Sequence, residues 1–181
     1  SFVFQSRVAA PELGQKFNEN DLLDGQQRMT TLLLLFAVIR DLTENVEAKE
    51  TCQKCIYQKA NTFLNIPDRT RLFFAIREDT QRFLEDDIIR EDGTAEIERS
   101  ISKINKKENI SIRNMANAII VMSNFFRNNP KTSPEELLHF LLNNVLMIYV
   151  STEDLEDAFR LFTILNDRGI PLRNSDILKS M

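Results

Sequence analysis

Hydrophobic positions recur at helical spacing along most of this chain, and short apolar runs typical of strands interrupt them in a few places. Apolar residues three and four positions apart indicate helices with one buried face. This pattern predicts helices near Gln26–Leu42, Lys49–Leu64, Thr80–Ile89, Ser111–Arg127, Pro134–Asn143, Leu155–Asp167 and Ser175–Met181. It predicts strands at Phe2–Gln5, Asp21–Leu23, Arg71–Ala75 and Val145–Val150, a turn at Asp92-Gly93-Thr94, and a lysine-rich connector or exposed helix start at Ser100–Glu108.

Helices outnumber strands in this assignment, which indicates an α+β fold that is predominantly helical. We expect one domain over residues 1–181, with a strand-turn-helix corner in residues 1–45. Residues 46–181 would form a helical lobe whose Val145–Val150 strand and Asn166–Gly169 segment return to the corner.

Polar chemistry is concentrated where the first long helix begins, in Asp24-Gly25-Gln26-Gln27-Arg28-Met29-Thr30-Thr31. The first N–H groups of a helix have no acceptor within the helix and lie at the positive end of its dipole, so an anion binds there readily. Gly25 permits close approach to the backbone, Arg28 offers a planar fork for phosphate, and Thr30 and Thr31 add hydroxyls. Asp24 and Gln27 also match a capping box, which would satisfy the same N–H groups internally. Both interpretations fit the spacing, and a nucleotide phosphate is the natural anion.

Composition narrows the class of protein. The 181 residues are 43% hydrophobic and 28% charged, with a formal net charge of −4 and a pI near 5.2. No apolar run approaches the roughly 20 residues of a membrane-spanning helix, and Ser1 to Asn20 lacks a secretory pattern, so we expect a cytoplasmic protein without membrane contact. The net negative charge argues against sequence-independent DNA binding by the chain as a whole. Two short basic clusters could touch DNA, but solvated surface is the better interpretation; they are Arg69-x-Arg71 and Lys103-x-x-Lys106-Lys107.

Metal ligands are sparse. Cys52-x-x-Cys55 and His139 fall short of the four ligands of a structural zinc site, so no zinc is expected and the thiols are assigned to packing or surface. The acidic runs Glu85-Asp86-Asp87 and Glu153-Asp154 could in principle bind Mg²⁺, but a solvated surface is the better interpretation. Asp24 is the better candidate for Mg²⁺, which accepts carboxylates together with phosphate oxygens.

Two segments resemble one known family. Asp24 to Arg28 with Thr30-Thr31 resembles the DGQQR-T-T signature of the GmrS-type domain at the N-terminus of GmrSD-like type IV restriction enzymes. Phe159 to Leu172, followed by Asp176-Ile177-Leu178-Lys179, resembles that family's F-x-x-L-N-x-R-G-x-x-L-x-x-x-D-x-x-K segment. The family's upstream I-P-x-Y-Q-R-x-Y-x-W-like stretch does not precede Ser1, and we therefore expect a fragment or an abbreviated member.

The resemblance implies a corner similar to the ParB and sulfiredoxin fold, in which a strand-turn-helix motif holds nucleotide phosphates. It implies nucleotide contact at Asp24, Gly25, Gln26, Gln27 and Arg28, and a supporting role for Asn166, Arg168 and Gly169. It also implies an HNH-type nuclease domain or subunit as partner, with DNA bound through the full assembly. Gly169 has a second interpretation, because it is equally suited to ending a helix before Pro171.

Two functions follow from these expectations. The first is a nucleotide-binding or NTPase regulatory domain of a DNA-restriction protein active in phage defence. In it Arg28 and backbone N–H groups hold a nucleoside triphosphate, Asp24 orients Mg²⁺ or a ribose hydroxyl, and Gln26 or Gln27 positions water. Binding is favoured over hydrolysis, and a lone His139 cannot supply a nuclease centre. The alternative is a non-catalytic module that contacts protein or DNA in a nuclease assembly.

Overall fold

The computed structural model describes residues 2–9, 17–64, 66–74, 77–107, 109–154, 156–157 and 160. It divides into two compact units, Ser1–Gln26 with Leu146–Met181 and Gln27–Val145. The predicted helices Leu155–Asp167 and Ser175–Met181 lie wholly or largely outside the described residues. The predicted α+β class with predominant helix is confirmed.

The first unit contains a three-stranded sheet. Strands β1 (Phe2–Ala9) and β2 (Phe17–Asp24) pair antiparallel, and β5 (Tyr149–Thr152) pairs parallel to β1, giving the order β2-β1-β5. Phe2, Val3 and Phe4 are buried, and the rings of Phe4 and Tyr149 lie 4.7 Å apart. The predicted strands Phe2–Gln5 and Asp21–Leu23 are thus confirmed, and both extend further than predicted. The strand predicted at Val145–Val150 was placed too early, because residues 145–148 are not in a strand.

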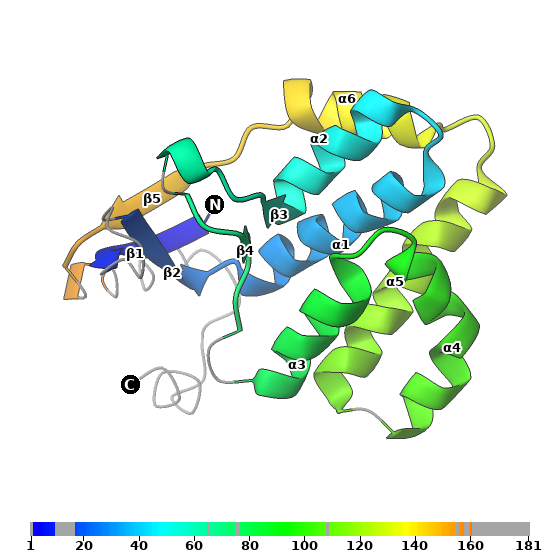
Figure 1. Cartoon of the computed structure of the whole chain (residues 1–181), viewed down its shortest axis with the longest axis horizontal. Helices are drawn as coiled ribbons and strands as arrows, with labels where there is room; N and C mark the ends of the chain where they lie inside the picture. Colours follow the sequence, from blue (N-terminus) through cyan, green and yellow to red (C-terminus); the bar gives the residue numbers. More distant parts are fainter. Residues whose placement is uncertain are drawn as a thin grey trace. The chain divides into compact units, whose positions relative to one another are not determined.

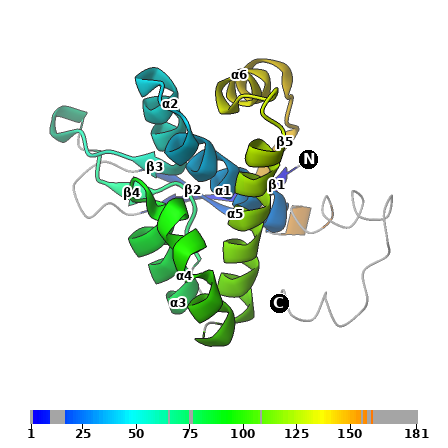
Figure 2. The same cartoon turned by 90° about the vertical axis from the view of Figure 1, so that its right-hand side faces the viewer.

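The second unit is built from helices around α1 (Gln26–Leu42), which runs through its middle with α2 (Val46–Ile56) and α6 (Pro134–Asn144) on one side (Figures 1 and 2). On the other side lie α3 (Glu78–Phe83) and α4 (Gly93–Lys107), and α5 (Ile110–Asn128) packs against both of these helices. The buried core residues Leu34, Ala37, Val38 and Ile39 all come from α1. This explains the strongly apolar sequence of α1, since a central helix is buried over much of its circumference.

The predicted helix Lys49–Leu64 was wrong at both ends. Residue Asn45 caps α2, its side chain accepting from the Ala48 N–H, and the helix ends at Ile56. The chain then becomes extended as β3 (Tyr57–Gln58), pairs antiparallel with β4 (Arg69–Thr70), and forms a short 3₁₀ turn at Thr62–Leu64. Strand pairing has overridden local helix propensity here, and the predicted strand at Arg71–Ala75 was placed too late, since β4 ends at Thr70.

A π-helical turn, Leu84–Ile88, continues α3, and the N–H of Ile89 donates to the carbonyl of Leu84 at 2.9 Å. The chain turns at Asp92, which has φ of 59°, and α4 begins directly at Gly93. For Ser100–Glu108 a connector or an exposed helix start was predicted; both were wrong for residues 100–107, which form the second half of α4. Its apolar residues Ile97, Ile101 and Ile104 pack on the core.

The junction between the π-helical turn and α4 is held by two buried charged residues, Arg40 and Asp41, at the end of α1. Their side chains are only 2% and 3% exposed, and Arg40 Nε donates to Asp41 Oδ1 at 2.7 Å. The remaining guanidinium N–H groups donate to Asp41 Oδ2, Gln53 Oε1 and the carbonyls of Ile88, Ile89 and Arg90. Arg40 thus satisfies carbonyls that the end of the π-helical turn leaves open.

Asp41 caps the start of α4. Its carboxylate accepts from the backbone N–H groups of Asp92 and Thr94 at 3.2 and 3.0 Å, and from the Thr94 hydroxyl at 2.8 Å. A carboxylate at a helix start is favoured by the unpaired N–H groups and by the helix dipole. One ion pair therefore terminates one helical segment and caps the next.

A second link joins the end of α1 to the start of α6. The buried Thr43 hydroxyl donates to Glu135 Oε1, while Ser133 and Glu136 form a capping box around the same helix start. The hydrogen bond from Thr43 is the main reason that the pKa of the Glu135 carboxyl lies below its ordinary value. The charged form of Glu135 is therefore favoured by folding.

We predict a pH-dependent contribution of Glu135 to stability. Because its pKa is lower in the folded chain, the stabilisation is present above the unfolded-state pKa and is lost as pH falls through the folded-state pKa. Replacement Glu135→Gln should lower the free energy of unfolding by about 1 kcal/mol at neutral pH and by much less in acid. Urea unfolding at several pH values measures this, with the exposed Glu44→Gln as control; a Glu135→Gln effect independent of pH would contradict the prediction.

Candidate functional site

The polar stretch predicted to bind an anion lies where β2 ends and α1 begins. Asp24 is the last residue of β2 and is half-buried, and Gln26 is the first residue of α1. Between them Gly25 is buried and has φ of 97°, a conformation that side chains with a Cβ rarely adopt. The backbone conformation of the turn therefore requires glycine even without a ligand.

A β-bulge lies immediately before this turn. Val3 of β1 pairs with Asp24, whereas the next residue, Phe4, pairs with Leu22, so Leu23 is an extra residue in β2. Bulges bend a strand and change the direction of its side chains, and they are frequent beside active sites. The end of β2 is thus irregular at the point where the candidate site begins.

The first turn of α1 presents polar side chains to solvent. Gln26, Gln27 and Arg28 are exposed, and Thr30 is half-buried. The side-chain amide of Gln26 donates to the carbonyl of Leu22 at 3.0 Å, which holds Gln26 against the end of β2. Exposed side chains of this kind can meet a ligand that approaches the helix start along its axis.

Thr31 is exposed on the same helix, but its hydroxyl donates back to the carbonyl of Gln27 at 2.8 Å. Such a bond to the preceding turn uses the only hydrogen of the hydroxyl. Thr31 is therefore a weaker candidate for donating to phosphate than Arg28.

The capping interpretation is shifted by one residue from the helix start. Because α1 begins at Gln26, Gly25 occupies the N-cap position and Asp24 stands one residue before it. In a capping box the side chain of the N-cap residue accepts from the N–H three positions later, and Gly25 has no side chain that could do so. The second predicted group, Asn166, Arg168 and Gly169, lies outside the described residues, so the predicted meeting of the two groups stays a prediction.

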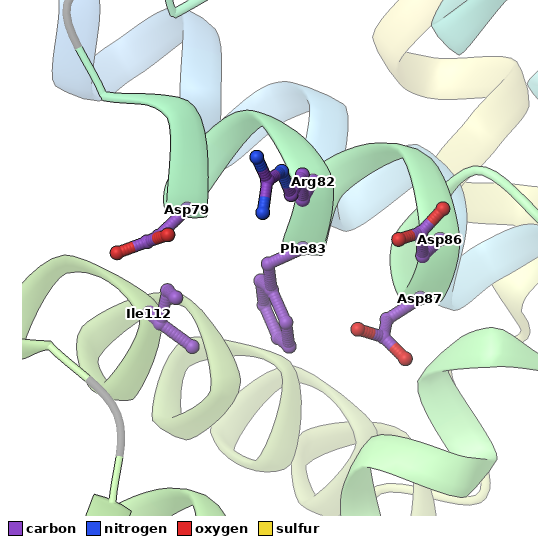
Figure 3. A pocket seen from close by; sticks show the side chains of 6 residues that line it. All are labelled: Asp79, Arg82, Phe83, Asp86, Asp87 and Ile112. Carbon is purple, nitrogen blue, oxygen red and sulfur yellow. The ribbon is translucent and has the colours of Figure 1, made fainter.

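The pockets in the described part of the helical unit include two that are not lined by any residue between 24 and 31. The smaller, of about 190 Å³, lies between α3, the π-helical turn and α5; in Figure 3 Phe83 points toward the side where Ile112 lies, with Asp79 and Asp87 on either side. Its lining is Asp79, Arg82, Phe83, Asp86, Asp87 and Ile112. Three carboxylates against one guanidinium make this pocket unfavourable for a phosphate group.

The larger pocket, of about 490 Å³, is lined by both acids and bases: Gln53, Tyr57, Asp68, Arg69, Thr70, Glu85, Ile89, Arg90 and Glu91. Burial is the main cause that raises the pKa of Tyr57, with Asp68 as a second cause. Sequence inspection did not single out this cavity, because its lining comes from five separated stretches of chain.

The thiols show no sign of activation. Cys52 is fully buried, and burial is the main factor that raises the pKa of its thiol to about 12; burial also raises the pKa of Cys55. Reactive and metal-binding cysteines need the thiolate form, which these surroundings disfavour. Among the described residues, no three His, Cys, Asp or Glu side chains gather closely enough to hold a metal ion.

In the part of the chain that the structure describes, no helix has both the length and the apolar character needed to cross a bilayer. Comparison with curated proteins gave no match, and neither did comparison with solved structures. A family model for the GmrSD restriction endonuclease, N-terminal domain, matches residues 1–181, which is the full length of the sequence. The chain therefore belongs to the family of GmrSD restriction endonuclease N-terminal domains, and its role lies in DNA restriction.

Proposed function

We propose that this domain binds a nucleoside triphosphate at the start of α1 and thereby regulates a DNA-restriction protein. The observation that carries the proposal is the junction itself. A buried glycine with φ of 97° opens a helix whose first turn exposes Gln26, Gln27 and Arg28. A helix N-terminus that follows a glycine turn is a recurrent site for phosphate in nucleotide-binding proteins.

Arg28 would supply the main attraction. Its guanidinium is permanently charged and presents parallel N–H groups that match two phosphate oxygens. The backbone N–H groups at the start of α1 add fixed donors that need no reorganisation when phosphate binds. The helical unit that follows holds α1 rigidly, because residues from Leu33 to Arg40 are largely buried.

Asp24 is the residue of this site suited to a cation or a ribose hydroxyl. The described residues offer no cluster that would hold Mg²⁺ without a nucleotide. Mg²⁺ normally combines one or two carboxylates with phosphate oxygens, and the single carboxylate of Asp24 fits that pattern. Bound there, the ion would supply charge neutralisation for the phosphates.

If hydrolysis occurs, Gln27 is the better candidate for orienting a water molecule. The amide nitrogen of Gln26 is engaged by the carbonyl of Leu22, whereas the side chain of Gln27 extends from the exposed surface of the first turn. Positioning of water by a glutamine is an established device of nucleotide hydrolases. Binding nevertheless requires only Arg28 and the backbone, so hydrolysis is a separate step of the proposal.

We predict that Arg28→Ala weakens nucleotide binding by about tenfold or more, since it removes a charge-assisted contact to phosphate. Isothermal titration with GTP, ATP and CTP analogues in Mg²⁺ measures the effect. The exposed arginine Arg99 on α4 provides a matched control, and Arg99→Ala should bind as the unaltered protein does. Equal affinity in Arg28→Ala and Arg99→Ala would exclude the start of α1 as the phosphate site.

A non-catalytic interaction module is the second candidate, and exposed apolar side chains favour it. Val121 and Phe125 on α5 and Phe140 and Leu142 on α6 are between 48% and 68% exposed. Surfaces of this kind often contact another protein. Co-purification with a nuclease subunit, together with no change in melting temperature on adding nucleotide, would favour this candidate over nucleotide binding.

A further inference from the structure

The β3–β4 hairpin carries the most exposed aromatic side chain among the described residues. Phe63 lies in the 3₁₀ turn between the two strands and is 97% exposed, and the neighbouring Leu64 is 56% exposed. A phenylalanine that remains in water forgoes the free energy that burial of its ring in a partner would provide.

The described residues of the tip are joined by hydrogen bonds of their own. Asn61 and Ile66 exchange both backbone hydrogen bonds, at 2.8 and 3.0 Å. The N–H of Leu64 donates to the side-chain oxygen of Asn61 at 3.2 Å, and the N–H of Ala60 donates to the carboxylate of Asp68. Phe63 is thus presented on a defined support, which lowers the entropy cost of inserting it into a partner.

Charge around the hairpin has the opposite sign to the charge of the whole chain. Residues 57–71 contain three basic side chains, Lys59, Arg69 and Arg71, and one acidic side chain, Asp68, whereas the whole chain has a net charge of −4. A local basic segment in an acidic chain indicates a polyanionic partner for that segment.

Arg71, at the base of the hairpin, keeps its charge available. Its guanidinium is exposed and donates to neutral groups, the carbonyl of Lys54 at 3.3 Å and the side-chain oxygen of Gln58 at 3.5 Å. Hydrogen bonds to neutral groups orient this cation without cancelling its charge.

We propose that the β3–β4 hairpin docks duplex DNA, with Lys59 and Arg71 on phosphates and Phe63 inserted against a base step. Cations on the backbone with an apolar wedge between bases are the combination by which architectural proteins hold and kink DNA. A two-stranded hairpin is also narrow enough to enter a groove. DNA supplies both phosphate and aromatic faces, and it is the substrate of the restriction family. This inference does not rest on nucleotide binding by α1.

The test is fluorescence anisotropy of a short labelled duplex over a series of salt concentrations, without nucleotide and again with GTP and Mg²⁺. The double variant Lys59→Glu with Arg71→Glu should weaken binding by about tenfold or more, and should reduce the slope of log affinity against log salt by about 1 per lost phosphate contact. Matched charge reversals at exposed positions outside the hairpin, Arg99→Glu with Lys131→Glu, should have much smaller effects.

Phe63 is tested separately with a duplex that contains 2-aminopurine, whose fluorescence rises when a base step is unstacked. The unaltered protein should raise this fluorescence, and Phe63→Ala should abolish the rise while leaving the salt slope unchanged. Val121→Ala, which also removes an exposed apolar side chain, should behave as the unaltered protein does. Equal affinity in the charge-reversed hairpin and its control, or absence of duplex binding in both conditions, would overturn the proposal. So would loss of self-association in Phe63→Ala with DNA binding intact.

The hairpin test and the nucleotide titration can fail independently. Hairpin variants that lose DNA but still bind nucleotide would support the hairpin site alone, because their start of α1 is unaltered. Arg28→Ala, which removes the proposed phosphate contact of α1, should keep its affinity for DNA in the absence of nucleotide. Loss of DNA binding in Arg28→Ala without nucleotide would contradict the separation of the two sites.

Discussion

Replacement Arg40→Met is expected to lower the free energy of unfolding by about 3–5 kcal/mol. The substitution leaves the carboxylate of Asp41 buried without its cation, and the side chain of Asp41 is only 3% exposed. It also removes the donors to Gln53 Oε1 and to the carbonyls of the buried residues Ile88 and Ile89, and a buried acceptor without a donor costs free energy. The loss should appear in the urea midpoint, since both helical segments at this junction depend on Arg40.

Arg99→Met serves as the matched control, because Arg99 is an exposed arginine on α4. Surface substitutions of this type change the free energy of unfolding by about 0.5 kcal/mol or less. If Arg40→Met and Arg99→Met had similar midpoints and similar dependence on urea, the buried ion pair would not have the structural role assigned to it.

Gly93→Ala is expected to have the second largest effect on stability, about 3 kcal/mol, through steric overlap. A Cβ on Gly93 would lie 1.7 Å from the carbonyl oxygen of Asp87 and 2.9 Å from its carbonyl carbon. Both atoms belong to the backbone of the π-helical turn, so a side-chain rotation cannot relieve the contact. The start of α4 would have to move away from the turn and from the capping carboxylate of Asp41.

Ser102→Ala on the exposed surface of α4 is the control for Gly93→Ala. Alanine is a better helix former than serine or glycine, so helix propensity alone predicts a small gain at both positions. Thermal unfolding should instead show a lower melting temperature for Gly93→Ala only. A stabilised Gly93→Ala would mean that α4 and the π-helical turn are farther apart than described.

Local sequence signals were sufficient to predict the boundaries of some helices. The predicted bounds of α1, Gln26–Leu42, agree with the structure, because a glycine precedes the helix and the polar Thr43-Glu44-Asn45 follows it. The N-terminus of α6 was equally clear, since Ser133, Pro134 and Glu136 form a capping box with proline in the first turn. In these places the residues that decide the boundary lie within one helical turn of it.

The prediction failed for α4 even though its signal was present. Ile97, Ile101 and Ile104 follow helical spacing, but the lysines and serines between them suggested a polar connector. The buried role of Arg40 could not be predicted from helical spacing. Its acceptors at Gln53 and at residues 88–90 are brought to it by tertiary packing, so no local pattern identifies a buried guanidinium there.

For the candidate site, the sequence located the stretch of chain but not its geometry. The concentration of Asp24, Gly25 and Arg28 before an apolar helix pointed to a strand-turn-helix junction, and that junction is present. The bulge at Leu23 depends on pairing with β1, which lies some twenty residues earlier in the chain, so no local pattern could reveal it.

The most direct test of phosphate binding at the start of α1 is a titration of isotope-labelled protein with GTP, ATP and CTP analogues in Mg²⁺, followed by backbone amide chemical shifts. Our account predicts saturable changes that are largest at the N–H groups of Gly25 to Arg28 and that disappear in Arg28→Ala. Saturable changes confined to other positions, such as the pocket lined by Tyr57 and Arg69, would contradict it, as would the absence of changes with all three nucleotides.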